Sequence, residues 1–227
     1  MTQHRGMTPT ASRLPLWFKL LYTAFVAVLV PTYWHHYGPG NFLYFCDLAL
    51  LLTGVALWME SAVLVSACAV GILLPQVLWM LDFLLTGLGW PITGMTAYMY
   101  EPSIPWFTRF LSFFHFWQPP VLVWLLWRLG YDRRGLVVWW PIGWAAMLAS
   151  YLWLPPPPAP ADQPGLPVNV NFVFGLDGQG PQTWMPPHLY LGVLMLALLV
   201  LLWWPSHWLL SRIPAFARAP VGRSTAR

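Results

Sequence analysis

Residues 61–83 read SAVLVSACAVGILLPQVLWMLDF, and their apolar character decides the fold class. The stretch contains one charged side chain, Asp82, which lies next to its end. An α-helix crosses the hydrocarbon core of a bilayer with about 20 predominantly apolar residues. The stretch therefore predicts a transmembrane helix.

The whole chain has the same character. Only 8% of its 227 residues are charged, whereas about 25% are charged in an average soluble domain. So few charges do not cover a water-exposed surface, and lipid is the expected solvent. The 17 Trp and 9 Tyr residues fit belts of aromatic side chains at the two membrane interfaces.

Five further stretches are apolar and long enough to be spans. They cover residues 16–34, 41–59, 107–127, 136–154 and 189–210. Together with residues 61–83 they predict an all-α fold, a polytopic transmembrane bundle of six spans in a single domain (residues 1–227). Residues 155–187 begin with four prolines and are expected to form an extended Pro-rich loop.

The positive charges orient this bundle. Ten of the eleven Lys and Arg residues fall on one side of it, and Arg109 is the exception. The ten are Arg5, Arg13, Lys19, Arg128, Arg133, Arg134, Arg212, Arg218, Arg223 and Arg227. Because basic residues are retained on the cytoplasmic side, both termini are predicted to be cytoplasmic and the Pro-rich loop to lie outside. The charges flank spans instead of forming a patch, so the net charge of +4 does not indicate a nucleic-acid partner.

Ionisable residues inside the spans collect in the outer half. With a rise of about 1.5 Å per residue, Asp47 lies roughly 9 Å and His115 roughly 12 Å from the outer ends of their spans. Such residues are costly in lipid and mark functional or structural cores. Thr108, Ser112, His115 and Gln118 follow spacings of four, three and three, which places them on one stripe of the helix. We expect a polar cavity that opens outward.

Asp47, Cys46 and His115 are the catalytic candidates. In one interpretation, Asp47 and His115 form a hydrogen-bonded pair that fixes helix packing. In the other, Asp47 orients His115 as a general base. Cys46 is either a nucleophile for His115 or a small apolar filler.

Six further polar residues are candidates for substrate binding because they belong to the same outer half. They are Gln76, Asp82, Ser112, Gln118, Asn169 and Asn171. The last two belong to residues 169–175, NVNFVFG, whose alternation predicts a short extended segment. Their amides either cap turns or donate hydrogen bonds from a lid into the cavity. No HxxxH or HExxH spacing and no Gly-rich phosphate loop occurs, so neither a metal nor a cofactor is expected.

Three stretches carry a resemblance: residues 41–47 (NFLYFCD), 111–115 (LSFFH) and 169–175 (NVNFVFG). They resemble a family of small bacterial integral membrane proteins. This resemblance implies a multi-pass protein of the bacterial inner membrane. More remotely, the order of these residues is similar to multi-pass lipid hydrolases and acyltransferases related to the androgen-dependent TFPI-regulating protein. That similarity implies a nucleophile at Cys46 and a base at His115.

The leading hypothesis is therefore a hydrolase or acyltransferase that acts on a lipid or acyl ester at the outer leaflet. A small transporter and a structural or binding subunit of a membrane complex are the alternatives. Membrane lipids are the expected partners, and a homo- or hetero-oligomer is compatible with the sequence. A transporter is less favoured because the spans show no obvious inverted repeats and no polar path on the cytoplasmic side.

Overall fold

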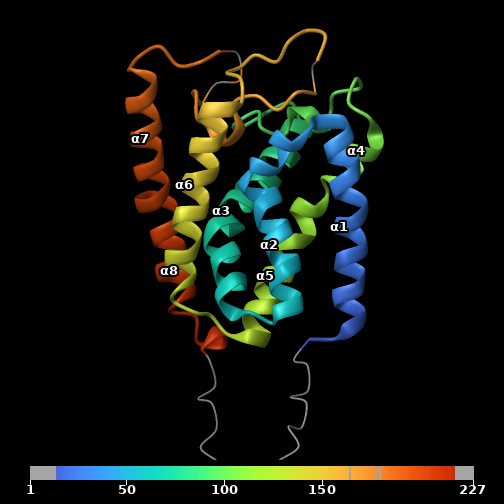
Figure 1. Cartoon of the computed structure of the whole chain (residues 1–227), viewed down its shortest axis with the longest axis vertical. Coiled ribbons are helices and arrows are strands. Elements are labelled where there is room, and N and C mark those ends of the chain that lie inside the picture. Colours follow the sequence, from blue (N-terminus) through green and yellow to red (C-terminus); the bar gives the residue numbers. More distant parts are fainter. Residues whose placement is uncertain (1–13, 164, 177, 179, 218–227) are drawn as a thin grey trace, which may run out of the picture.

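The computed structural model describes residues 14–163, 165–176, 178 and 180–217, and in this part all regular elements are helices (Figure 1). Five of the basic residues used for orientation, Arg5, Arg13, Arg218, Arg223 and Arg227, lie outside the described residues.

Eight α-helices form the body of the protein. They are α1 (Leu16–Tyr37), α2 (Phe45–Met59), α3 (Ala62–Gly87), α4 (Trp106–Leu111), α5 (Phe114–Leu129), α6 (Gly135–Trp153), α7 (Pro187–Ala197) and α8 (Trp204–Leu210). A π-helical segment, η4 (Leu198–Trp203), joins α7 to α8. Short 3-10 turns are η1 (Pro39–Leu43), η2 (Ala97–Met99), η3 (Val170–Phe172) and η5 (Pro214–Phe216).

Four helices in the described part are long and apolar enough to cross a membrane: α1, α3, α6 and the combined helix Pro187–Leu210. They match four of the stretches that the sequence predicts as spans. The chain is therefore an all-helical membrane protein.

Helix α3 is the centre of the bundle, where it packs against α2, α5, α6 and α8 (Figure 1). Small residues permit this close packing, as in other membrane helices. A Cβ atom on Gly71 would lie 1.9 Å from the ring of Trp139, and one on Gly135 would lie 2.7 Å from the backbone of Ser66. The hydroxyl of Ser66 also accepts a hydrogen bond from Asp132 N at 2.8 Å.

The two ends of the bundle differ in charge. The lower end in Figure 1, called the basic end here, carries Lys19, Arg133, Arg134 and Arg212. Both described chain ends lie there, since Leu14 N donates to Glu60 and Phe216 O accepts from Tyr131 N. The upper end, called the loop end, carries residues 88–105 and the Pro-rich loop.

Residues 107–127 do not form one continuous helix as the sequence predicts. Helix α4 ends at Leu111, and α5 begins at Phe114. At the break the backbone changes to i→i+3 hydrogen bonds, from His115 N to Ser112 O and from Phe116 N to Phe113 O. Hydropathy does not reveal this break because apolar residues predominate on both sides of it.

Candidate functional site

The candidate residues lie in the half of the bundle next to the loop end, and all except Cys46 are buried. Asp47 is 3% exposed and His115 is 6% exposed. The stripe Thr108, Ser112, His115 and Gln118 is also buried. The structure thus shows these side chains as a buried polar cluster, and the cavity open to the outside stays a prediction.

Asp47 lies in the first turn of α2, and one of its two carboxylate oxygens has no hydrogen-bond partner among the described residues. Its Oδ2 accepts a hydrogen bond from Asn41 Nδ2 at 3.1 Å and faces the Cys46 sulfur at 4.0 Å. Its Oδ1 is buried and has no partner among the described residues. A buried oxygen without a donor costs free energy, so this atom marks a site where a donor is expected to bind.

The segment around Asn171 covers the start of α2. Asn171 Oδ1 accepts from Phe45 N at 3.2 Å, and Asn171 Nδ2 donates to Leu43 O at 2.8 Å. Both contacts lie within four residues of Asp47. Asn171 therefore fastens the Pro-rich loop over the N-terminus of α2.

The extended conformation predicted for residues 169–175 is wrong. Asn169 and Asn171 have positive φ angles of 49° and 58°, and η3 is a tight turn. Asn adopts this left-handed region more readily than most residues, which a reading of polar and apolar alternation does not take into account. Asn169 caps the turn, since its Oδ1 accepts from Phe174 N at 2.9 Å and its Nδ2 donates to Gly175 O at 2.8 Å.

His115 is held in one orientation. Its Nδ1 lies 2.7 Å from Ser112 O. A carbonyl oxygen only accepts hydrogen bonds, so Nδ1 carries the proton, and Nε2 of the neutral ring carries the lone pair. No described residue hydrogen-bonds to Nε2. The ring stacks on Trp79 at 4.3 Å and on Phe114 at 4.1 Å between ring centroids. An oriented ring with an available lone pair is a suitable general base.

Hydroxyl groups link the neighbourhood of His115 to α1. Tyr33 OH lies 2.6 Å from Ser112 Oγ, and Tyr37 OH donates to Thr108 Oγ1 at 2.8 Å. The carboxylate of Asp47 interacts electrostatically with both phenols and with Tyr98. The hydroxyls thus lie between the elements that carry Asp47 and His115.

Tyr98 joins this group from the loop after α3. Burial raises the pKa of its phenol well above the ordinary value, and its hydroxyl is within hydrogen-bonding reach of Ser112. The phenol therefore keeps its proton at neutral pH.

Gln76 and Gln118 form a second polar pair below the stacked Trp79 and His115. Gln76 Nε2 donates to Gln118 Oε1 at 3.0 Å. Gln76 Oε1 and Gln118 Nε2 are buried without a partner in the described structure. One turn separates this pair from Trp79 and His115 on α3 and α5, so the two pairs stack along the same interface.

Asp82 has a different role from the other candidates. Its Oδ1 accepts from the backbone N–H groups of Ile92, Thr93 and Gly94 at 2.7–3.2 Å. Its Oδ2 accepts from Thr96 N and Thr96 Oγ1 at 3.0 and 2.7 Å. Both oxygens therefore accept hydrogen bonds from the loop after α3 and fix its conformation.

The structure does not join Cys46 to His115. Among the described residues, the hydrogen-bond contact of the Cys46 sulfur is Asp47 Oδ2, and the polar contact of His115 is Ser112 O. The two cysteines are both free thiols, and Cys68 is buried in α3. In the described part, no group of three or more His, Cys, Asp or Glu side chains is arranged to hold a metal ion.

Asn41, Tyr33 and Tyr37 belong to the cluster but were not predicted from the sequence as site residues. Tyr33 and Tyr37 are spaced by four residues, so they share one face of α1, and this spacing was an available signal. No local pattern indicated that Asn41 contacts Asp47, because the intervening turn η1 sets their separation.

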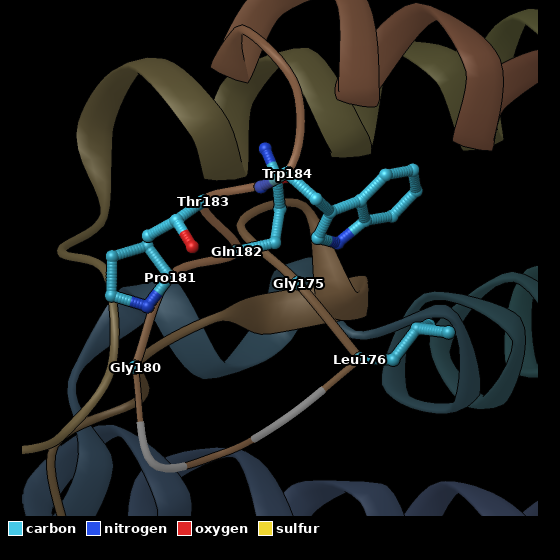
Figure 2. Close-up of a pocket in the computed structure, with 7 residues that line it drawn as sticks. All are labelled: Gly175, Leu176, Gly180, Pro181, Gln182, Thr183 and Trp184. Carbon is cyan, nitrogen blue, oxygen red and sulfur yellow. The ribbon is translucent and has the colours of Figure 1, made fainter.

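A hollow of about 370 Å³ lies apart from this cluster, in the Pro-rich loop (Figure 2). Its lining residues all come from one segment of that loop: Gly175, Leu176, Gly180, Pro181, Gln182, Thr183 and Trp184. The side chain of Gln182 is occupied within the segment, since it donates to Met185 O and accepts from Trp184 N and Met185 N. None of the candidate residues lines this hollow.

Comparison of the chain with protein-family models, curated proteins and solved structures gives no match.

Proposed function

We propose that the chain is a six-span protein of the bacterial inner membrane with both termini in the cytoplasm, and that the Asp47–His115 cluster hydrolyses an acyl ester of a membrane lipid. The two additional spans are α2, preceded by η1, and the broken helix α4–α5. This topology is supported by the described basic residues, which lie at the basic end except for Arg109.

The observation that carries the catalytic proposal is the orientation of His115. Ser112 O fixes the proton on Nδ1, so Nε2 is the nitrogen available to accept a proton. In the proposed step, Nε2 takes a proton from water while the water oxygen bonds to the ester carbonyl carbon. The bond from that carbon to the alcohol oxygen then breaks, and the alcohol oxygen takes the proton from Nε2. The products are a fatty acid and an alcohol.

Water is a better nucleophile for this site than Cys46. The resemblance implies a Cys46–His115 pair, but the thiol contacts Asp47 and not His115. The unpartnered Asp47 Oδ1 is an acceptor that can orient a bound water. Substrate access requires the turn η3 to move, since Asn171 closes the start of α2.

A transporter is supported less well by the packing. The half of the core nearer the basic end is largely apolar, with Leu57, Val65, Leu125 and Leu126 fully or almost fully buried. Alternating access needs a polar route on both sides of the binding site.

The test is fatty-acid release from phospholipid in mixed micelles by the purified protein, measured by mass spectrometry. Asn places its Nδ2 where His has Nδ1, so His115→Asn keeps a donor for Ser112 O and removes the base. We expect turnover to fall about 10²- to 10⁴-fold, the usual contribution of a general base. His188→Asn is the matched control, because His188 is exposed at the start of α7.

Two outcomes would contradict the proposal: no release by the wild type with any phospholipid class, or full activity in His115→Asn. The Cys46→Ala and Cys68→Ala variants form a second matched pair. Activity lost only in Cys46→Ala, with covalent labelling of Cys46 by an acyl substrate, would replace water by the thiol as nucleophile.

A further inference from the structure

A second hollow, of about 290 Å³, lies at the basic end, far from the candidate site along the bundle. It is lined by Arg133, Trp204, His207, Trp208, Ser211 and Arg212. Arg133 comes from the loop between α5 and α6, and the other residues come from α8 and its end. The hydrogen bond of 2.7 Å between Tyr131 OH and His207 Nδ1 fastens these two segments together.

The two arginines of this hollow lack acidic partners. The ion pairs found in the described structure join Lys19 to Glu60 at 2.8 Å and Arg134 to Asp132 at 2.9 Å. These two acids are the acidic residues of the basic end. Arg133 and Arg212 are both exposed, so the hollow presents two positive charges to an incoming anion.

Arg212 is placed to bind an anion along its edge. Its guanidinium lies over the ring of Trp208, 4.3 Å from the ring centroid. Stacking uses the face of the guanidinium and leaves its N–H edge available, and this planar edge matches two oxygens of a phosphate. The Nδ1 of His207 is occupied by Tyr131, so Nε2 is its nitrogen available to a ligand.

The surface beside the hollow is apolar and suited to acyl chains. Trp204 and Trp208 are spaced by four residues and are 55% and 45% exposed on the same face of α8. Leu201, one turn before Trp204, is 73% exposed. Free phosphate has no apolar part that could contact this face. A phospholipid can place its phosphate at the basic end and its acyl chains along the helix.

We propose that this hollow binds the phosphate of an anionic phospholipid, with Arg133 and Arg212 as the charged contacts and the exposed face of α8 as the chain track. The site lies on the side where the basic residues gather, where anionic lipids attract positive charge. It is independent of the catalytic proposal, since it shares no residue with the Asp47–His115 cluster.

The test uses the full chain in nanodiscs of phosphatidylcholine with increasing phosphatidylglycerol, and measures the thermal midpoint and the bound lipid by native mass spectrometry. We expect phosphatidylglycerol to raise the midpoint and to be retained on the protein. In Arg133→Gln/Arg212→Gln the apparent affinity should fall about thirtyfold, which corresponds to about 2 kcal/mol at about 1.4 kcal/mol per tenfold. Arg134→Gln is the charge control, because Arg134 is exposed and paired with Asp132.

The double variant must keep the wild-type midpoint in pure phosphatidylcholine, which shows that it folds. If it does not, Trp208→Leu provides the second test, because it removes the platform of Arg212 and keeps the apolar surface. The proposal is overturned if the double variant, or Trp208→Leu where that test is needed, responds to phosphatidylglycerol like the wild type. It is also overturned if inorganic phosphate or glycerol phosphate gives the same protection, which would show a phosphate site without lipid recognition.

Discussion

At the scale of single residues, His115 serves the fold as well as the proposed reaction. Its Nδ1 donates to Ser112 O at the point where α4 ends and α5 begins. At the helix break Ser112 O lacks its usual α-helical donor, Phe116 N. It accepts instead from His115 N and from His115 Nδ1. The same hydrogen bond sets the tautomer of the ring, so structure and chemistry depend on one contact.

This double role predicts a stability difference between two substitutions. His115→Ala removes the donor and leaves a gap against Trp79, so the free energy of unfolding should fall by about 1–3 kcal/mol. His115→Asn keeps a donor and should recover most of this loss. The measurement is unfolding by titration with a denaturing detergent, followed by circular dichroism. Equal destabilisation by both variants would show that the Ser112 contact does not support the break.

Asn171 predicts a second pair of effects. Asn171→Ala leaves Phe45 N and Leu43 O without their partner and also places Ala at a φ of 58°. We expect it to lower the free energy of unfolding by about 1–3 kcal/mol more than the exposed control Gln163→Ala.

Asn171→Gly removes the same side chain but tolerates the backbone conformation. It should therefore be about 1 kcal/mol less destabilising than Asn171→Ala in the same titration. Identical values for Gly and Ala would mean that backbone strain at this position has no effect.

At the scale of elements, small residues determine how closely α3 and α6 approach. The ring of Trp139 is fully buried and lies against Gly71, and Trp203 lies against Gly143 in the same way. Phe45 touches both Trp rings at 6.1 and 5.7 Å between centroids. This aromatic packing joins α6 to α3 on one side and to η4 on the other, in addition to the direct contact of α3 with α8.

The contact predicts opposite outcomes for two Gly→Ala substitutions. Gly71→Ala brings a Cβ to 1.9 Å from a ring that has no room to move, and should cost at least about 1–3 kcal/mol. Gly192→Ala, within α7, meets nothing within 4 Å and should be neutral or stabilising by up to about 1 kcal/mol. The measurement is the thermal midpoint of each purified variant, compared with that of the wild type. A wild-type midpoint for Gly71→Ala would contradict the packing.

Hydropathy predicts the long helices of this fold and little of what lies between them. Residues 61–83 and three other stretches are confirmed as helices long enough to span, because length and apolarity are additive along the sequence. Residues 41–59 give a helix of 15 residues, since the turn η1 occupies their start. The break at Ser112 and the turn at Asn171 depend on side-chain hydrogen bonds, which hydropathy does not count.

The sequence indicates where along the spans the candidate residues lie, but not which residues are their hydrogen-bond partners. The depth of Asp47 and His115 in their spans placed both on the same half of the bundle, next to the long loops, and that this half holds a functional site stays a prediction. The pairing of Asp47 with Asn41 depends on the turn η1, and that of Ser112 with Tyr33 depends on how α1 packs against the end of α4; no residue pattern encodes these distances. Asp82 is a buried carboxylate, as a site residue often is, but all five of its hydrogen-bond donors belong to the loop that follows α3.

At the scale of the whole molecule, the two ends of the bundle differ both in charge and in the segments that they carry. The described chain ends meet at the basic end, and the long loops lie at the other. Asp47 and Asp82 belong to the half next to the loops, and Glu60 and Asp132 compensate positive charge at the basic end. This difference supports the proposed orientation across the membrane.

The proposed orientation predicts a labelling pattern in a Cys46→Ala/Cys68→Ala background. Ala161→Cys, exposed in the Pro-rich loop, should react with a membrane-impermeant thiol reagent in intact cells. Ala215→Cys, exposed in η5 at the basic end, should react only after the membrane is opened. Labelling of both positions in intact cells, or the reverse order, would contradict the orientation.

The π-helical segment η4 accommodates one extra residue without changing the face that the end of the last helix presents. A π turn contains one residue more than an α turn, and here it carries Trp203, which packs against Gly143. Deleting one residue from α7 while η4 is kept would rotate everything beyond the deletion by about 100° relative to the start of α7. Trp208 and Arg212 would then leave the face that meets Arg133, although the hydropathy of the chain would hardly change. Among descendants of this sequence, we expect insertions and deletions in the Pro-rich loop, and within the last helix only a one-residue deletion at η4, where the π turn can become an α turn.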